Sequence, residues 1–250
     1  MKRATPLLLV ALAGCGSSPA ERAEPTPTPT PHFAVARERA AAPAAPAAPA
    51  QPRGRWATAR VLRATALRAA PGGHRVGRLK PRTEFGSSKV VSVVGEHSGW
   101  LRVIVPERPN GRPAWIRASA ARAGAVNVSL RVDRSERRLT VWRHGKVVRR
   151  VEVAVGRPGN ETPTGRFAVT DKLRTQRPDS PYGCCAIALS GHQPKLLPGW
   201  PGGDRLAIHA TPQTDSIGTA ASLGCLRART RDLQALLQIV PLGAPVFVSP

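Results

Sequence analysis

LAIHATPQTDSIGTAASLGCLR, residues 206–227, is the stretch on which the interpretation of this chain depends. Its first residues, Leu206–Ile208, form a short apolar run typical of a buried strand, and His209 follows directly. Near its end Gly224 stands immediately before Cys225. Covalent cysteine catalysis needs an imidazole within hydrogen-bond distance of a thiol. A glycine beside the thiol leaves room for backbone N–H groups to turn toward an oxyanion.

This stretch closely resembles the active-site motif of the L,D-transpeptidase family, the YkuD-type catalytic domain. In that family a strand histidine precedes a segment of Ser/Thr-His-Gly-Cys-apolar-Arg/Asn. Six residues of this chain match the pattern in order: His209, Ser222, Gly224, Cys225, Leu226 and Arg227. Leu223 departs from it, because the family usually has a second histidine at that position. The alternative is a structural cysteine in a disulfide or core, with a satisfied histidine nearby.

The resemblance implies a role for each matched residue. Cys225 would be the nucleophile and His209 its base. Backbone N–H groups around Gly224 and Cys225 would hold the oxyanion, while Ser222 and Arg227 would brace the turn. The stretch TPTGRF, residues 162–167, is a second match to the same family, where it leads into a strand beside the active site.

Residues 172–205 contain five prolines and are predicted to be loop-rich. By the same resemblance this region is the lid of the substrate cleft, and Tyr182 and His192 are candidates to line it. A structural role is the alternative for each. The adjacent residues Cys184 and Cys185 leave three possibilities open: a vicinal disulfide, pairing with another thiol, or the reduced state.

Composition restricts the partners. The 250 residues include 38 Lys and Arg against 15 Asp and Glu, giving a net charge of +23 and favouring polyanionic partners. Aromatic residues make up only 4%, and no recognition helix or RNA-binding signature is found, which argues against nucleic acid. Anionic cell-wall polymers of a bacterial envelope are the better fit.

The N-terminus predicts export. A basic start at residues 1–3 precedes the apolar stretch PLLLVALA at 6–13, which is too short to span a bilayer. The sequence LAGC at 12–15 resembles a lipobox, so residues 1–15 are predicted to be a lipoprotein signal peptide with Cys15 as the lipid-bearing residue. The expected location is the outer face of the cytoplasmic membrane. A secretory signal with a chance cysteine, giving a periplasmic or secreted protein, is the alternative.

The rest of the chain divides into three parts. Residues 16–55 are a Pro-, Ala- and Thr-rich linker that favours polyproline II over helix or sheet. Short β signals separated by turns in residues 56–122 resemble a bacterial SH3-like domain and predict a small β-barrel. Residues 125–250 are the predicted catalytic domain, in which His144 and Gly145 are predicted to form a hairpin turn between two strands. The predicted fold class is therefore mainly β, with an SH3-like barrel before a β-rich L,D-transpeptidase domain.

The catalytic domain is predicted to end in a short helix and a strand. Four apolar residues recur at helical spacing after Thr230, which is the expected N-cap: Leu233, Leu236, Leu237 and Val240. Pro241 and Gly243 stop this helix, and the stretch at 246–248 is a closing strand.

Together these features predict an exported peptidoglycan L,D-transpeptidase that forms cross-links through a cysteine thioester and releases D-alanine from tetrapeptide stems. No cofactor and no metal are expected. The acceptor stays open between a diamino-acid amine, water and another amine. A cysteine peptidase or carboxypeptidase acting on wall peptides is one rival, although SH3-linked peptidases present the cysteine before the histidine. A non-catalytic wall-binding protein is the other, for which Leu223 is the hint.

Overall fold

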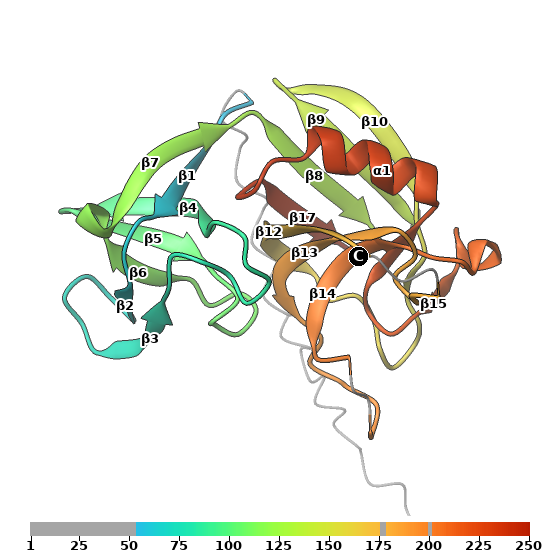
Figure 1. The fold of residues 1–250 in the computed structure, drawn as a ribbon, viewed down its shortest axis with the longest axis horizontal. Coiled ribbons are helices and arrows are strands. Elements are labelled where there is room, and N and C mark those ends of the chain that lie inside the picture. The colour runs from blue at the N-terminus through green and yellow to red at the C-terminus, as the bar shows by residue number, and fades with distance from the viewer. Residues whose placement is uncertain (1–53, 176–178, 200–201) are drawn as a thin grey trace, which may run out of the picture. The chain divides into compact units, whose positions relative to one another are not determined.

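The computed structural model describes residues 54–250, apart from 176–178 and 200–201. The predicted signal peptide, Cys15 and nearly all of the linker at 16–55 lie outside the described residues. Strands dominate the described part, and one α-helix, α1 (Thr230–Ile239), lies near its end (Figure 1). The predicted mainly β class with a short C-terminal helix is therefore confirmed. No helix among the described residues has the length and apolar character needed to cross a bilayer.

The first seven strands form one antiparallel sheet in the order β3-β2-β6-β5-β4-β1-β7. They are β1 (Trp56–Val61), β2 (Thr65–Arg68), β3 (Arg75–Leu79), β4 (Val90–His97), β5 (Trp100–Ile104), β6 (Ala114–Arg117) and β7 (Ala121–Val126). A 3-10 turn, η1 (Ala118–Ala120), connects the last two. This sheet has its own buried cluster, which includes Leu67, Leu79, Val103 and Ile116. The SH3-like identification of this region stays a prediction.

The boundary after this sheet differs from the expected one. Strand β7 pairs with β1 along its whole length, from Val61 opposite Ala121 to Trp56 opposite Val126. The predicted catalytic domain would begin at residue 125, inside this strand. The first sheet thus extends beyond its predicted end at residue 122, because β1 offers a complete row of backbone partners to β7.

The second sheet has eight strands in the order β10-β9-β8-β17-β12-β13-β14-β16. They are β8 (Val128–Asp133), β9 (Arg138–Arg143), β10 (Lys146–Glu152), β12 (Gly165–Arg174), β13 (Cys185–His192), β14 (Arg205–Ala210), β16 (Leu226–Ala228) and β17 (Pro245–Ser249). Most pairs are antiparallel, but β17 with β8 and β14 with β16 are parallel. The short strands β11 (Val155–Gly156) and β15 (Ala220–Ser222) pair separately, and η2 (Thr214–Ser216) precedes β15.

The hairpin between β9 and β10 turns where the sequence predicts it. His144 and Gly145 both have positive φ, at 51° and 76°. Two consecutive residues of this kind form the type I′ turn whose twist matches that of the flanking strands. The local sequence is therefore sufficient to define this connection.

Strand β13 is a correction to the predicted loop at 172–205. Seven of its eight residues are buried, and it lies between β12 and β14. Its sequence CAIALSGH carries small and apolar residues on both faces. A central strand covered on both sides loses the polar–apolar alternation by which strands are usually identified.

Helix α1 packs against the second sheet through the apolar stripe that the sequence predicts. Leu233 and Leu236 are fully buried, and the helix contacts β13 and β14. Its N-cap is Arg229 without a side-chain cap bond, so the predicted capping role of Thr230 is wrong. Thr230 is instead the first helical residue.

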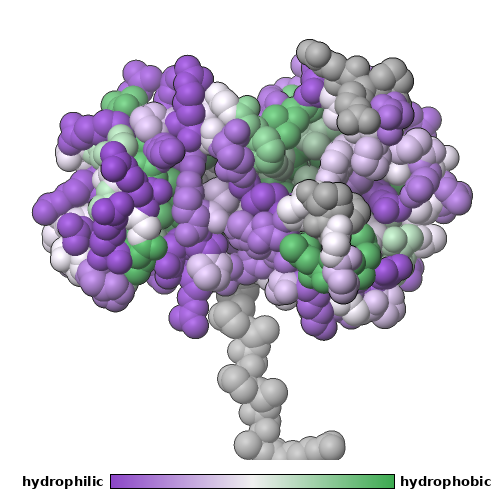
Figure 2. Space-filling view, turned by 60° about the horizontal axis from the view of Figure 1, so that its bottom comes forward, coloured by the Kyte–Doolittle hydropathy of each residue, from purple (hydrophilic) through white to green (hydrophobic). Residues whose placement is uncertain are grey.

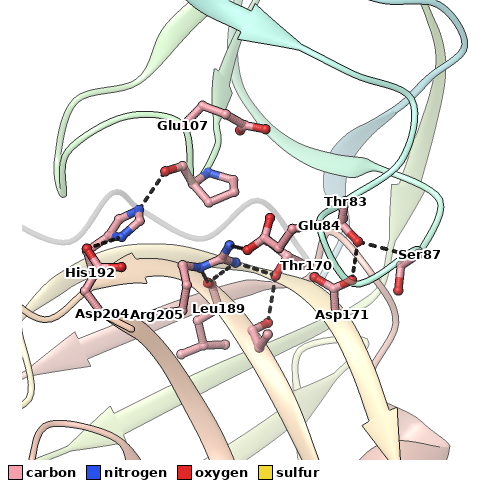
Figure 3. Close-up of polar contacts among 12 residues, drawn as sticks. Thr83, Glu84, Ser87, Glu107, Thr170, Asp171, Leu189, His192, Asp204 and Arg205 are labelled. Atoms are coloured by element: carbon pink, nitrogen blue, oxygen red, sulfur yellow. Dashed lines mark hydrogen bonds and ion pairs between the residues drawn. The ribbon is translucent and has the colours of Figure 1, made fainter. Parts of the chain in front are cut away.

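Polar side chains connect the two sheets (Figure 3). In the segment between β3 and β4, the Thr83 hydroxyl donates to Oδ1 of Asp171 on β12 at 2.5 Å, and Asp171 is completely buried. Beside it, Glu84 forms an ion pair with Arg205, the first residue of β14. The second sheet is therefore anchored to the first at β12 and at β14.

His192 makes a third connection between the sheets. Its Nε2 lies 2.6 Å from the carbonyl oxygen of Pro106, and its Nδ1 lies 2.9 Å from a carboxylate oxygen of Asp204 (Figure 3). The Asn110 amide also exchanges two hydrogen bonds with the His192 backbone, at 2.7 and 2.9 Å. The end of β13 is thereby held against the segment that follows β5.

The buried contact between Thr83 and Asp171 leads to a prediction on stability. Thr83→Val should lower the free energy of unfolding by about 1–3 kcal/mol. The buried Asp171 carboxylate would lose its hydrogen-bond donor, while the valine side chain would fill the volume of the threonine. Oδ2 of Asp171 already has no partner among the described residues. Urea denaturation would measure the change. Thr83→Ser keeps the hydroxyl and is the matched control; equal stabilities for the two variants would contradict the prediction.

Candidate active site

The pairing of β14 with β16 brings the predicted nucleophile and base together. These strands are parallel, with Ile208 opposite Leu226 and His209 opposite Arg227. One residue earlier, the backbone N–H of Ala207 donates to the Cys225 sulfur. Extending this register by one residue sets Cys225 opposite Ala207, and the His209 side chain lies on the same face of β14 as that of Ala207, two residues earlier.

Both side chains line a pocket of about 90 Å³. Tyr182, Leu223 and Arg227 are among the other residues around it. Cys225 is partly buried and is the free cysteine of the described chain. The thiol is thus available within a cleft rather than sealed inside the core, which argues against a purely structural cysteine.

His209 is held as a neutral imidazole. Its side chain is buried, and its Nδ1 lies 2.6 Å from the carbonyl oxygen of Ala210. That oxygen only accepts, so Nδ1 carries the proton and Nε2 keeps its lone pair. Burial lowers the pKa of His209 to about 4; the Ala210 carbonyl opposes this shift and the Arg227 charge adds to it. The imidazole can therefore accept a proton at neutral pH.

Cys225 rests as a thiol. Burial raises the pKa of Cys225, and this effect outweighs the Ala207 N–H and the Arg227 charge, which both lower it. The Cys225 S–H also lies 3.8 Å from the carbonyl oxygen of Arg205. A neutral thiol beside a neutral imidazole requires that the proton leave the sulfur as the sulfur attacks.

The turn that carries Cys225 is closed by Ser222. The Ser222 hydroxyl donates to the Cys225 carbonyl at 2.5 Å and accepts the Gly224 N–H at 3.0 Å. Ser222 therefore holds the turn through its side chain. The Gly224 N–H is used within the turn, which does not agree with its predicted role in holding an oxyanion.

Position 224 requires a glycine, because of its backbone conformation and because the Gln193 side chain lies close to it. Its φ is +118°, and a Cβ atom here would lie 2.1 Å from Nε2 of Gln193. The Gln193 amide donates to the carbonyl oxygens of Leu223 at 3.0 Å and of Asn160 and Glu161 at 3.2 Å. Gln193 thus fastens the cysteine turn to the 160–161 loop.

The first threonine of the TPTGRF stretch, Thr162, supports the same turn from the other side. Thr162 Oγ1 donates to the Gly224 carbonyl at 2.8 Å and accepts the Gly156 N–H at 2.9 Å. Sequence reasoning matched this stretch to the family but assigned Thr162 no role. It missed Gln193 altogether, because no local pattern distinguishes a glutamine that crosses to a distant turn.

Arg227 contributes through its backbone and its charge. Its N–H and carbonyl exchange hydrogen bonds with Ala154 at 3.1 and 2.9 Å. Its guanidinium donates to the Gln213 side chain at 3.1 Å and lines the pocket. The residue therefore both holds the end of the turn and places a positive charge beside the reactive pair.

The two predicted lid residues have different surroundings. The Tyr182 ring lines the pocket and meets the His209 imidazole edge-on, with ring centroids 5.0 Å apart. His192 does not line this pocket, which corrects its predicted substrate-binding role. Its ring is held by Asp204 and Pro106 where the two sheets meet.

The remaining cysteines of the described chain are already paired. Cys184 and Cys185 form a vicinal disulfide at the start of β13, which decides between the three possibilities that the sequence leaves open. Among the described residues, no group of three or more His, Cys, Asp or Glu side chains is arranged to hold a metal ion.

Comparison with known proteins connects this site to one family. The family model described as the YkuD L,D-transpeptidase catalytic domain matches residues 127–248. Two relatives are named "Putative L,D-transpeptidase": YkuD of Bacillus licheniformis, 31% identical over 119 residues, and YqjB of Bacillus subtilis, 30% identical over 128 residues. The alignments cover 48% and 47% of this chain, and 64% and 69% of the respective relatives.

Solved structures that match this chain include L,D-transpeptidase 3 from Mycobacterium tuberculosis. It is 19% identical, with a TM-score of 0.41, and the alignment covers 55% of this chain and 74% of the other. An L,D-transpeptidase from Mycobacterium smegmatis is 15% identical, with a TM-score of 0.42 over 77% of this chain and 99% of the other.

The close approach of Gly224 to Gln193 leads to a prediction on the turn. Gly224→Ala should lower the free energy of unfolding by at least about 1 kcal/mol more than Gly145→Ala does. Both glycines have positive φ, but a Cβ at Gly145 meets no atom within 4 Å. Urea denaturation of the two variants separates the clash with Gln193 from backbone strain. Equal losses would show that Gln193 moves aside freely.

The protonation state of the pair leads to a prediction on pH. The rate at which iodoacetamide alkylates Cys225 should keep rising from neutral pH through about pH 9, because burial raises the pKa of this thiol and leaves little thiolate below it. Mass spectrometry of the Cys225 peptide at several pH values would give the rate at this residue alone. A level rate between about pH 6 and pH 8 would instead indicate a preformed thiolate–imidazolium pair.

Proposed function

Because the chain belongs to the YkuD family of L,D-transpeptidase catalytic domains, we propose that it is an L,D-transpeptidase that acts on peptidoglycan stem peptides. The observation that carries this proposal is the free Cys225 thiol in the same pocket as a neutral His209 whose Nδ1 is fixed by Ala210. The chain spans 64% of the length of the Bacillus licheniformis relative.

The first half-reaction forms a thioester. As the Cys225 sulfur attacks the carbonyl carbon of the amide before the terminal D-alanine of a tetrapeptide stem, the thiol proton passes to Nε2 of His209. The carbonyl oxygen becomes an oxyanion, which we assign to the backbone N–H of Cys225 because the Gly224 N–H already donates to Ser222. The C–N bond then breaks, and D-alanine leaves with the proton from the imidazolium.

The second half-reaction returns the enzyme to its resting state. A side-chain amine of a neighbouring stem attacks the thioester carbonyl, and His209 accepts the proton that the amine loses. The C–S bond breaks, the thiolate recovers that proton, and a new amide cross-links the two stems. Water in place of the amine would release a free carboxylate, so the same site supports a carboxypeptidase as the alternative activity.

The charges around the pocket support an anionic stem peptide as substrate. Lys195, Arg205 and Arg227 line it, against Asp204 as the one acidic residue of the described lining. The terminal D-alanine of a stem carries a free carboxylate, which a positive field of this kind favours. Tyr182 and Leu223 give the pocket an apolar part beside these cations.

Leu223 distinguishes this site from the usual family pattern. It lines the pocket at the position where the family has a second histidine. A leucine offers no hydrogen bond, so this chain relies on Ser222, Gln193 and Thr162 to hold the turn. The base itself is retained, which favours an enzyme over a purely binding protein.

We also propose that the protein is exported and anchored to the outer face of the cytoplasmic membrane through Cys15. The basic start, the short apolar stretch and the LAGC site at 12–15 support this proposal. The vicinal disulfide is consistent with an oxidising compartment. The linker at 16–55 would then connect the anchor to the catalytic part.

The assignment of nucleophile and base leads to a prediction on acylation. A carbapenem, which mimics the D-alanyl stem for this family, should add once to the protein, at Cys225. His209→Ala should slow this acylation by about 10²-fold or more, because a general base contributes on this scale. Intact-mass time courses and peptide mapping would measure both, and release of D-alanine from a tetrapeptide would report turnover.

His192→Ala is the matched control, since it removes an imidazole that lies outside the Cys225 pocket. It should change the acylation rate far less than His209→Ala does. An adduct on Cys184 or Cys185, or an unchanged rate after loss of His209, would contradict the assignment. Acylation without D-alanine release from any stem peptide would retain the nucleophile but exclude the proposed substrate.

A further inference from the structure

A second pocket lies where the two sheets meet and shares no lining residue with the Cys225 pocket. Its volume is about 240 Å³. Four arginines line it: Arg102 on β5, Arg108 and Arg112 in the segment between β5 and β6, and Arg166 on β12. Its lining includes no Asp or Glu. Among the described residues, the lining of this pocket is therefore positively charged and includes no negatively charged side chain.

The arginines of this pocket have unused hydrogen-bonding capacity. The Nε atoms of Arg108 and Arg166 are buried and have no partner among the described residues. Arg102 and Arg112 are exposed, and no described carboxylate forms an ion pair with either. Buried polar groups in folded proteins are nearly always satisfied, so unpaired guanidinium nitrogens in a pocket indicate a missing acceptor.

The two inner arginines are held in place by the protein. The Arg108 guanidinium lies 3.4 Å from the Val76 carbonyl, and that of Arg166 lies 3.3 Å from the Ser92 hydroxyl. The Arg166 guanidinium also lies over the rings of Trp56 and Phe247. Burial lowers the pKa of Arg166, because its charge has lost water without gaining an anion. A bound anion would supply the negative charge and the hydrogen-bond acceptor that the Arg166 guanidinium lacks.

We propose that these four arginines form a binding site for the phosphate groups of a phosphodiester-linked polyanion that carries no nucleobases. Guanidinium groups bind phosphate oxygens in bidentate geometry, and several of them match the charge and acceptors of a phosphate better than those of a single carboxylate. Binding of single-stranded nucleic acid uses exposed aromatic rings for base stacking. The one aromatic residue that lines this pocket, Phe167, is 2% exposed.

The position of the pocket would allow it to bind a polymer apart from the site of the proposed reaction. Its lining residues come from both sheets, including β5, β12 and β13. A polyanion bound there would contact the chain outside the catalytic pocket. Hydrophilic residues cover much of the surface drawn in Figure 2, which agrees with a strongly basic chain that meets charged partners. The site would hold the enzyme on a polymer while Cys225 stays free to react.

Calorimetric titration of the full chain with a short glycerol phosphate oligomer, at about 0.15 M ionic strength, would test the proposal. Arg102→Ala combined with Arg112→Ala should weaken binding by about tenfold or more, because each charge-assisted contact is worth more than a neutral one. The matched control combines Arg78→Ala with Arg122→Ala, which removes the same charge from exposed positions on β3 and β7. The control should weaken binding about twofold or less.

Nuclear magnetic resonance of the arginine Nε–H groups would locate the ligand directly. Inorganic phosphate should shift the signals of Arg108 and Arg166, whereas acetate at the same concentration should not. Equal losses of affinity in the two double variants would overturn the proposal, because they would indicate a diffuse field without a site. Equal shifts with acetate would overturn the preference for phosphate. Tighter binding of an oligothymidylate with the same number of phosphates would overturn the class of partner.

Discussion

The parallel pairing of β14 with β16 is the interaction on which the proposed chemistry depends. It sets His209 opposite Arg227 and brings Cys225 beside Ala207. Neither strand would hold this register alone, because β16 has only three residues. The turn before β16 is therefore fastened separately through Ser222 and Gln193. Backbone pairing places the two reacting groups, and side-chain hydrogen bonds keep the turn from relaxing.

The first sheet also contributes to the position of β14. Arg205 begins that strand, and its side chain binds Glu84 of the first sheet as well as Leu189 and Thr170 of the second. The carbonyl of the same residue faces the Cys225 sulfur. The two sheets are thus connected through the strand that carries the base, which gives the N-terminal region a structural role in addition to any ligand that it binds.

Sequence patterns predicted those features that are determined by neighbours along the chain. The β9–β10 hairpin and the apolar face of α1 are of this kind. That His209 and Cys225 lie in one pocket was expected from the resemblance to a family motif, and other features that depend on distant contacts were not predicted. Strand β13 was missed because burial on both faces removes its alternation. Gln193 was missed because its three acceptors lie elsewhere in the sequence. His192 was misplaced because its ring lies between Asp204, just before β14, and the Pro106 carbonyl of the segment after β5.

The vicinal disulfide affects which sulfur remains reactive. A bridge between residues 184 and 185 encloses no intervening chain, so it restricts the unfolded ensemble far less than a bridge across a long loop would. Each of these two cysteines has its nearest neighbour in the chain as its partner. Among the described cysteines, Cys225 is then the one with a free thiol, so an acyl donor that enters the pocket meets a single nucleophilic sulfur.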